Sequence, residues 1–290
     1  MFAKNFFSIE ISLSIYKRIV LFSTFFLFLQ FFLYHIFDFY LPGYIPFLNI
    51  EREELISYST HIYTAVNQRM RSIFSEPAHY AAYAAFYLHL NLIMNSLNKV
   101  KINDLVICFF ITIGIVLSSS TTGIALISLS WSIFFLKKIL KGKINLKYIF
   151  FTPFILALIF YVLQLDDVQH AFFRLTTNSS NEVRLANRAA IDLSSLSITS
   201  LFGHGMDLQG IYLASFERML FYFGILGTII FVGTFFILAK KNNYSLWIFL
   251  YMIVMGVGTG LWISGNIMLY LSYLISFSFI YRGTNEKFNT

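Results

Sequence analysis

Residues 19–41, IVLFSTFFLFLQFFLYHIFDFYL, form an apolar run with no lysine or arginine and a single acid, Asp38, near one end. A helix needs roughly 17–25 predominantly apolar residues to cross the hydrocarbon core of a bilayer, so this run predicts a transmembrane helix. The rest of the chain has the same character, because 58% of its 290 residues are hydrophobic, 12% are charged and its mean hydropathy is +0.70. Soluble domains are nearer ~45–50% apolar and ~25% charged. The composition therefore excludes a soluble enzyme, a disordered chain, a coiled coil and a disulfide scaffold.

Further apolar runs predict an all-α polytopic membrane protein of eight helices that forms one integral membrane domain over residues 1–290. The expected spans are 19–41, 78–98, 102–119, 121–136, 148–165, 216–239, 245–262 and 265–281. The third and fourth form a tight hairpin turned by SSSTTG. Two connecting segments, 42–77 and 166–215, are too long for simple turns, and such long loops are usually functional. We expect both to be extracytoplasmic.

The charges support an arrangement with both termini in the cytoplasm. The inner segments then hold 14 of the 21 basic residues and 3 of the 14 acids, and the outer segments hold 7 basic and 11 acidic residues. The net charge of +7 separates into +11 inside and −4 outside, which obeys the positive-inside rule. The basic balance therefore reports topology, and we expect no nucleic-acid partner.

The two kinds of basic residue are also sorted by side. All twelve lysines lie inside, and every outer basic residue is an arginine. The outer arginines are Arg52, Arg69, Arg71, Arg174, Arg184, Arg188 and Arg218. Because the planar guanidinium fork matches phosphate and carboxylate, these side chains either pair with the outer acids or bind an anionic substrate.

The first long outer segment ends in NQRMRSIFSEPAHYAAYAAF, residues 67–86. Pro77 fits the first turn of a helix, where its missing N–H does no harm. Glu76 would then lie at the positive end of that helix, directly after Arg69 and Arg71. Glu76 either caps the helix and pairs with Arg71, or forms a substrate site with the arginines; we favour the substrate site.

The second long outer segment contains TTNSSNEVRLANRAAIDLSS, residues 176–195. Its polar residues recur at every fourth position, which predicts an amphipathic helix that presents Arg184 and Arg188 in line. These arginines contact either lipid phosphates or a substrate. His204 follows between two glycines, which permit a tight loop. It is either a structural residue or an acid–base or hydrogen-bonding group.

Several kinds of site are missing from the sequence. It has no Gly-rich phosphate loop, no G-x-S-x-G, H-E-x-x-H or C-x-x-C motif and no spaced metal-binding pair, so we expect neither a cofactor nor a metal. Few ionisable residues lie within the spans, which disfavours an ion-coupled transporter. The residues instead indicate a site at the outer leaflet for an anionic amphiphile, such as a lipid diphosphate.

Three patches carry a resemblance to a known family. They are RSIFSEPAHYA at 71–81, LSSSTTGI at 117–124, and the pair formed by EVRLANR at 182–188 and LFGHG at 201–205. In this order they resemble the signatures of the Wzy/O-antigen ligase family of bacterial membrane glycosyltransferases, in its capsule and O-antigen polymerase branch. The agreement extends over roughly residues 65–280. Because family members have several spans before the first patch and this chain has one, we expect a short or N-terminally truncated member.

The resemblance implies a GT-C-like fold and a metal-independent glycosyltransferase of the bacterial cytoplasmic membrane. Such an enzyme polymerises undecaprenyl-diphosphate-linked oligosaccharide repeat units on the outer face, alongside a flippase and a chain-length regulator. As a hypothesis, the arginines hold the diphosphate, and an acid or histidine accepts the proton of the acceptor hydroxyl. The substrate-binding residues would be Arg69, Arg71, Arg184 and Arg188, and the catalytic residues would be Glu76 and His204.

Other functions share these features. A ligase that moves finished glycan to another acceptor would carry the same motifs. A polysaccharide exporter or flippase is the non-enzymatic alternative, and a scaffold within an exopolysaccharide complex is a further one.

Overall fold

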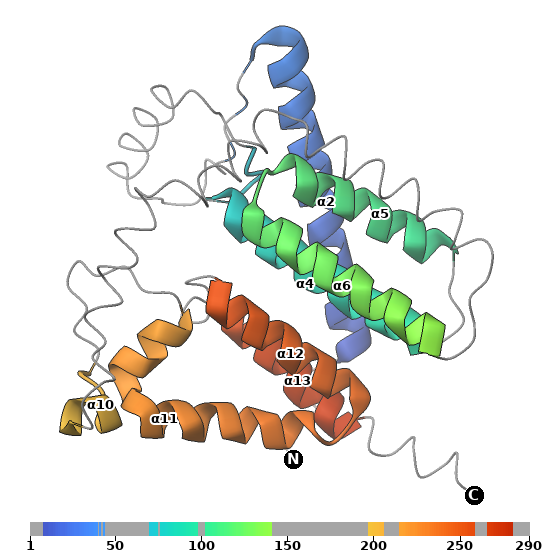
Figure 1. The fold of residues 1–290 in the computed structure, drawn as a ribbon. Helices are drawn as coiled ribbons and strands as arrows, with labels where there is room; N and C mark the ends of the chain where they lie inside the picture. Colours follow the sequence, from blue (N-terminus) through green and yellow to red (C-terminus); the bar gives the residue numbers. More distant parts are fainter. Residues whose placement is uncertain are drawn as a thin grey trace, which may run out of the picture. The chain divides into compact units, whose positions relative to one another are not determined.

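The computed structural model describes residues 8–39, 41, 43, 70–74, 76–97, 102–140, 197–205, 215–258 and 266–280. This part of the chain is helical and contains no strand (Figure 1). The helices are α2 (Ile9–Phe37), α4 (Pro77–Leu97), α5 (Ile102–Leu117), α6 (Thr121–Leu140), α10 (Ile198–Phe202), α11 (Ser215–Ala239), α12 (Asn243–Gly258) and α13 (Asn266–Ile280).

Helices occupy seven of the eight expected spans, and the prediction of an all-helical fold is confirmed for the described residues. The expected span 148–165 and the expected amphipathic helix around Arg184 and Arg188 lie outside those residues. α2 begins ten residues earlier than expected, because no glycine or proline interrupts the chain between Ile9 and Phe37. The short helix α10 was not expected.

Two of the described helices, α2 and α11, are long and apolar enough to cross a bilayer. α5, α12 and α13 are apolar but shorter than the usual spanning length. α4 has a lower mean apolarity because it carries histidine and asparagine.

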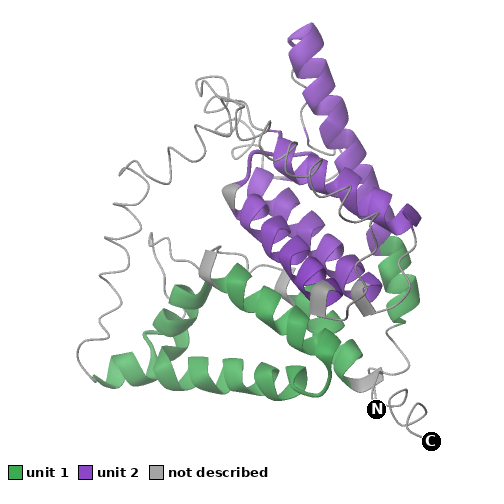
Figure 2. Ribbon diagram, turned by 45° about the vertical axis from the view of Figure 1, so that its right-hand side comes forward, with its two compact units in different colours: residues 1–15, 174–290 green, residues 16–173 purple. Residues whose placement is uncertain are grey.

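The chain divides into two compact units, which Figure 2 shows in different colours. One unit comprises residues 16–173, and the other comprises residues 1–15 and 174–290. The boundary falls inside α2. Each unit is described below by itself, and the single domain expected over residues 1–290 stays a prediction.

In the unit of residues 16–173, α4 lies at the centre. Between Tyr80 and Asn95 nearly all of its side chains are buried. α4 and α6 lie side by side (Figure 1) and approach closely through small residues. A Cβ added at Gly123 of α6 would come within 2.6 Å of the Ala81 Cβ of α4. Small residues at helix contacts allow this close packing.

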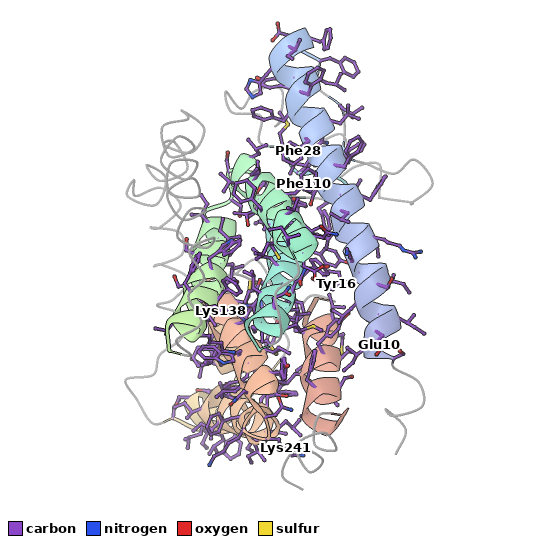
Figure 3. All side chains as sticks on the ribbon, turned by 90° about the vertical axis from the view of Figure 1, so that its right-hand side faces the viewer. Glu10, Tyr16, Phe28, Phe110, Lys138 and Lys241 are labelled. Atoms are coloured by element: carbon purple, nitrogen blue, oxygen red, sulfur yellow. The ribbon has the colours of Figure 1, made fainter. Side chains whose placement is uncertain are left out.

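α2 and α5 complete the unit. The ring of Phe28 in α2 stacks on Phe110 of α5 with centroids 4.9 Å apart, a pair labelled in Figure 3. Gly114 of α5 admits both the Thr24 side chain and the Tyr80 hydroxyl, which lie 2.7 Å and 2.6 Å from the position that a Cβ would take. These contacts join α2 and α5 to α4.

Polar residues of α4 find partners inside the same unit. The buried His89 Nδ1 lies 3.1 Å from Ser130 Oγ of α6. The Asn95 side chain donates to Asn91 Oδ1 at 2.6 Å. A central helix surrounded by others can therefore carry polar side chains, since each can be hydrogen-bonded within the bundle. This explains why α4 is less apolar than the helices around it.

In the other unit, α12 and α13 pack against each other and run in opposite directions. Asn242 precedes α12, accepts the Ser245 N–H at 2.8 Å as an N-cap, and donates to Phe277 O near the end of α13 at 2.6 Å. Tyr273 of α13 shares a 2.7 Å hydrogen bond with Ser12 in the first turns of α2.

α11 differs from the single straight span expected over residues 216–239. Gly224 has φ 63° and ψ −172°, so two helical segments meet there. Figure 1 shows the resulting sharp bend beside α10. A break of this kind frees backbone N–H and C=O groups, which must then find hydrogen-bond partners elsewhere.

Candidate functional site

The start of α4 presents the first candidate residues. Pro77 is the first residue of the helix, and the Glu76 carbonyl accepts the N–H groups of His79 and Tyr80 at 3.1 Å and 3.3 Å. The prediction that Pro77 begins a helix directly after Glu76 is confirmed. The Glu76 side chain is exposed and lies at the positive end of α4. An exposed carboxylate in this position is able to contact a ligand.

The segment just before α4 is held by Gln30 of α2. The Gln30 Oε1 atom accepts the Ser72 N–H at 2.8 Å, and its Nε2 donates to Leu41 O at 2.9 Å and to Ser72 O at 3.3 Å. The Ser72 hydroxyl donates to Ser23 O at 2.5 Å. Gln30, Ser23 and Ser72 are all buried. We call these four hydrogen bonds the Gln30 clamp.

The clamp fixes an unusual backbone conformation. Ser72 has φ 58°, a left-handed value that non-glycine residues adopt rarely and at a cost of about 1–3 kcal/mol. The chain at Gly43 passes so close that an added Cβ would overlap the Ser72 carbonyl. Two neighbouring segments therefore hold Ser72, and with it the position of Arg71, which is half-buried and adjacent.

The SSSTTG turn lies at the same end of this unit as Glu76. Ser119 follows the end of α5 with φ 50°, and Ser120 caps α6 by accepting the Gly123 N–H at 3.2 Å. Because Gly123 packs on Ala81 in the first turns of α4, the turn is next to the start of that helix. The expected hairpin is confirmed. The structure thus brings the first and second patches together.

The third patch lies in the other unit, where the glycine loop contacts the break in α11. The His204 N–H donates to Phe221 O at 2.7 Å, and the Gly205 N–H donates to Tyr222 O at 3.3 Å. These are carbonyls that the break at Gly224 releases from the helical pattern, so the loop supplies the hydrogen bonds that they need. The His204 ring is exposed and stacks on Phe221 with centroids 4.6 Å apart.

Two glycines make this contact possible. An added Cβ at Gly203, where φ is 86°, would lie 2.2 Å from Tyr222 O. An added Cβ at Gly224 would lie 2.3 Å from Leu201 O. Neither position has room for a side chain, and both have the positive φ that glycine adopts without strain. The two backbones therefore cross in direct contact, which fixes the place of His204 relative to α11.

Backbone conformations with positive φ coincide with the three patches. Among the described residues they occur at Asp38, Ser72, Ser119, Gly203, Gly205 and Gly224. Four of these lie inside the patches, and Gly224 is the contact partner of the third patch. Such conformations cluster at functional sites because the surrounding structure must hold them in place.

Sequence reasoning missed the two residues that hold the patches. Gln30 is the lone amide in an apolar run, and a polar residue within a membrane span is a signal for a bundle-facing function. Gly224 gave no signal, since glycine is common in transmembrane helices.

The expected site residues fall in different parts of the molecule. Arg71 and Glu76 belong to the unit of residues 16–173, and His204 belongs to the other unit. The roles expected for Arg69, Arg184 and Arg188 fall on residues outside the described part of the chain. Within that part, no three His, Cys, Asp or Glu side chains group as metal ligands.

The chain was compared with known proteins. It matches no protein-family model, no curated protein and no solved structure.

Proposed function

We propose that this chain is a metal-independent membrane glycosyltransferase that polymerises undecaprenyl-diphosphate-linked oligosaccharide repeat units on the outer face of the bacterial cytoplasmic membrane. The Gln30 clamp is the observation that carries the proposal. It fixes the backbone at Ser72, directly after Arg71 and four residues before Glu76 at the start of α4, so a cation and a carboxylate lie close together in the chain. Fixed groups of opposite charge suit a reaction in which one binds phosphate and the other accepts a proton.

The surface of α2 supports a membrane location. Large apolar side chains on one face of the helix are 37–63% exposed: Ile19, Phe22, Phe25, Leu29, Phe32 and Ile36. They recur every three or four residues along about 26 Å of helix, which is close to the thickness of the hydrocarbon core. The opposite face is buried and carries Ser23, Thr24 and Gln30. A soluble helix has the reverse arrangement, with its polar face outside.

The ends of the α4–α6 pair support the proposed orientation, with both termini in the cytoplasm. Both helices end where the basic residues lie. Lys138 near the end of α6 is buried and donates to Asn95 O in the last turn of α4 at 3.2 Å (Figure 3). A lysine beside the negative end of a helix stabilises that end. Glu76 is at the opposite end of α4, which the positive-inside rule assigns to the outside.

The chemistry assigned to these residues is a glycosyl transfer. The acceptor hydroxyl oxygen of one repeat unit attacks the anomeric carbon of the other, and the bond from that carbon to the diphosphate oxygen breaks. The diphosphate leaves with the electron pair, and Glu76 or His204 takes the hydroxyl proton. Arg184 and Arg188 hold the departing diphosphate, while Arg69 and Arg71 bind acceptor or donor phosphate; a fixed donor of this kind contributes ~10²–10³ in rate.

The test uses the native strain with its copy of the gene deleted and replaced by variants. Deletion is expected to leave single lipid-linked repeat units on the outer face, and the unchanged gene is expected to restore long polymer. Glu76→Gln, Arg71→Ala and Arg184→Ala are expected to shorten or abolish polymer. Lys240→Ala, directly after the C-terminal end of α11 and outside the proposed site, is the matched control and is expected to behave as wild type.

The alternatives give different products. If the chain is a ligase, its deletion would leave polymer on the lipid diphosphate and abolish only the transfer to a new acceptor. If the chain is an exporter or flippase, its deletion would cause lipid-linked units to accumulate inside the cell. Wild-type polymer lengths in all three site variants would contradict the proposal.

A further inference from the structure

Arg218 is a basic residue to which the proposed chemistry assigns no role. It lies in the first turn of α11 and is half-buried. Its Nε atom is buried and makes no hydrogen bond with any residue in the described ranges. A buried donor on a charged group costs free energy when nothing accepts its hydrogen. Arg218 thus has donor capacity that the described residues leave unused.

The local helix does not compensate for this charge. The N-terminal turn of a helix has a positive potential, which disfavours a cation there. Glu217 precedes Arg218 directly, but adjacent positions on a helix project about 100° apart and do not face each other. An anion bound next to Arg218 would relieve both the unfavourable potential and the unused donor.

His204 is a second group able to contact an anion, and Phe221 connects it to the same segment of α11. Phe221 follows Arg218 by three residues, so the two side chains share one face of the first segment of α11. The exposed His204 ring stacks on Phe221. The crossing of Gly203 and Gly224 holds the histidine loop against this segment. The histidine loop is therefore held against the segment of α11 that carries Arg218.

We propose that Arg218 forms an anion-binding site on the first segment of α11 that takes a diphosphate group, with His204 beside it. The inference rests on the proposed function for the source of that group, which is the diphosphate of a lipid-linked glycan. The guanidinium donates charge-assisted hydrogen bonds to phosphate oxygens. The same chemistry would accept a soluble diphosphate, so the test distinguishes the two sources.

The experiment measures binding to the full chain in lipid nanodiscs. The probes are farnesyl diphosphate, inorganic pyrophosphate and farnesol, titrated against wild type, Arg218→Gln, Arg218→Lys and Lys240→Ala. Lys240→Ala removes one positive charge directly after the C-terminal end of α11, so it controls for general charge effects. Helical content measured by circular dichroism shows whether each variant is folded. If Arg218→Gln does not fold, Arg218→Lys, which keeps the charge, serves as the test variant.

We expect Arg218→Gln to weaken farnesyl diphosphate binding roughly 10–100-fold, the loss that corresponds to hydrogen bonds with a charged group. Arg218→Lys should weaken it less, and Lys240→Ala should leave it unchanged. The affinity for farnesol should be the same in wild type and in both Arg218 variants. Tighter binding of farnesyl diphosphate than of pyrophosphate supports the lipid source, and equal binding assigns the site to a soluble diphosphate and overturns the lipid source.

Unchanged diphosphate binding in both Arg218 variants, or an equal loss in Lys240→Ala, would overturn the site. The result is independent of the proposed polymerase activity. Loss of diphosphate binding in Arg218→Gln, together with normal polymer in the Glu76→Gln and Arg71→Ala strains, would support the site while contradicting the proposed reaction.

Discussion

Replacing Gln30 with methionine removes three of the four hydrogen bonds of the clamp at nearly constant side-chain volume. The substitution deletes the three hydrogen bonds that the Gln30 amide makes to the backbone at Ser72 and Leu41. The Ser72 N–H is fully buried and would lose its acceptor. A buried group left unsatisfied costs ~1–3 kcal/mol, and the two carbonyls add a smaller amount, so the free energy of unfolding should fall by about 2–5 kcal/mol.

The chain carries its own reporter for this experiment. Cys108 is its single cysteine, and it is fully buried in α5, within the same unit as Gln30. Its thiol therefore reacts with a maleimide fluorophore only when the unit opens. Since 1 kcal/mol shifts the Tm by about 2–4 °C at this size, Gln30→Met should lower the Tm measured in detergent by about 4–20 °C.

Two variants make the result specific. Leu29→Met places the same new side chain on the exposed face of α2 and should shift the Tm by no more than about 1–2 °C. Ser72→Gly keeps the backbone groups that Gln30 binds and relieves the positive φ, so it should cost less than Gln30→Met. Equal melting temperatures for Gln30→Met and Leu29→Met would refute the role assigned to the clamp.

Two further predictions concern α11 and α2. Gly224→Ala should destabilise the protein, because its Cβ would overlap backbone atoms at a positive φ. Gly233→Ala has open space around it and should leave the stability unchanged or raise it by up to about 1 kcal/mol. Thermal melts by circular dichroism compare the two variants, and equal destabilisation would contradict the crossing at the break. For α2 in nanodiscs, a spin label at position 25 in a Cys108→Ala background should be accessible to oxygen and shielded from a polar nickel reagent, because Phe25 is exposed. A label at position 27, where Leu27 is buried, should be shielded from both reagents. Access of the nickel reagent to the label at position 25 would argue against a lipid-facing surface on α2.

The existence of the helices follows from composition and from the positions of the apolar runs. Long stretches without glycine, proline or charge have few alternatives to a helix once water is excluded, because every backbone group must then be hydrogen-bonded within the segment. The start of α4 at Pro77 and the hairpin after Leu117 were predictable for a similar reason. Proline and serine act on the helix ends locally, through a missing N–H or a capping hydroxyl.

For the site residues, the sequence predicts the residue types and the segments in which they occur, but not the contacts that hold them. The separation of arginine-bearing segments from lysine-bearing segments is a property of the sequence, and it predicts Arg71 and Glu76 as site residues. The sequence could not show that Gln30 holds Ser72, because the two residues are separated by 42 positions and the bonds end on backbone atoms that every residue possesses.

The bend in α11 shows the same division. Apolar periodicity predicts one continuous helix, since it depends on side chains and contains no information about the backbone at Gly224. The bend exists because the carbonyls that it releases at Phe221 and Tyr222 are satisfied by the histidine loop. Local sequence therefore establishes which segments become helices, while long-range hydrogen bonds and close backbone contacts establish where those helices are held, bent and joined.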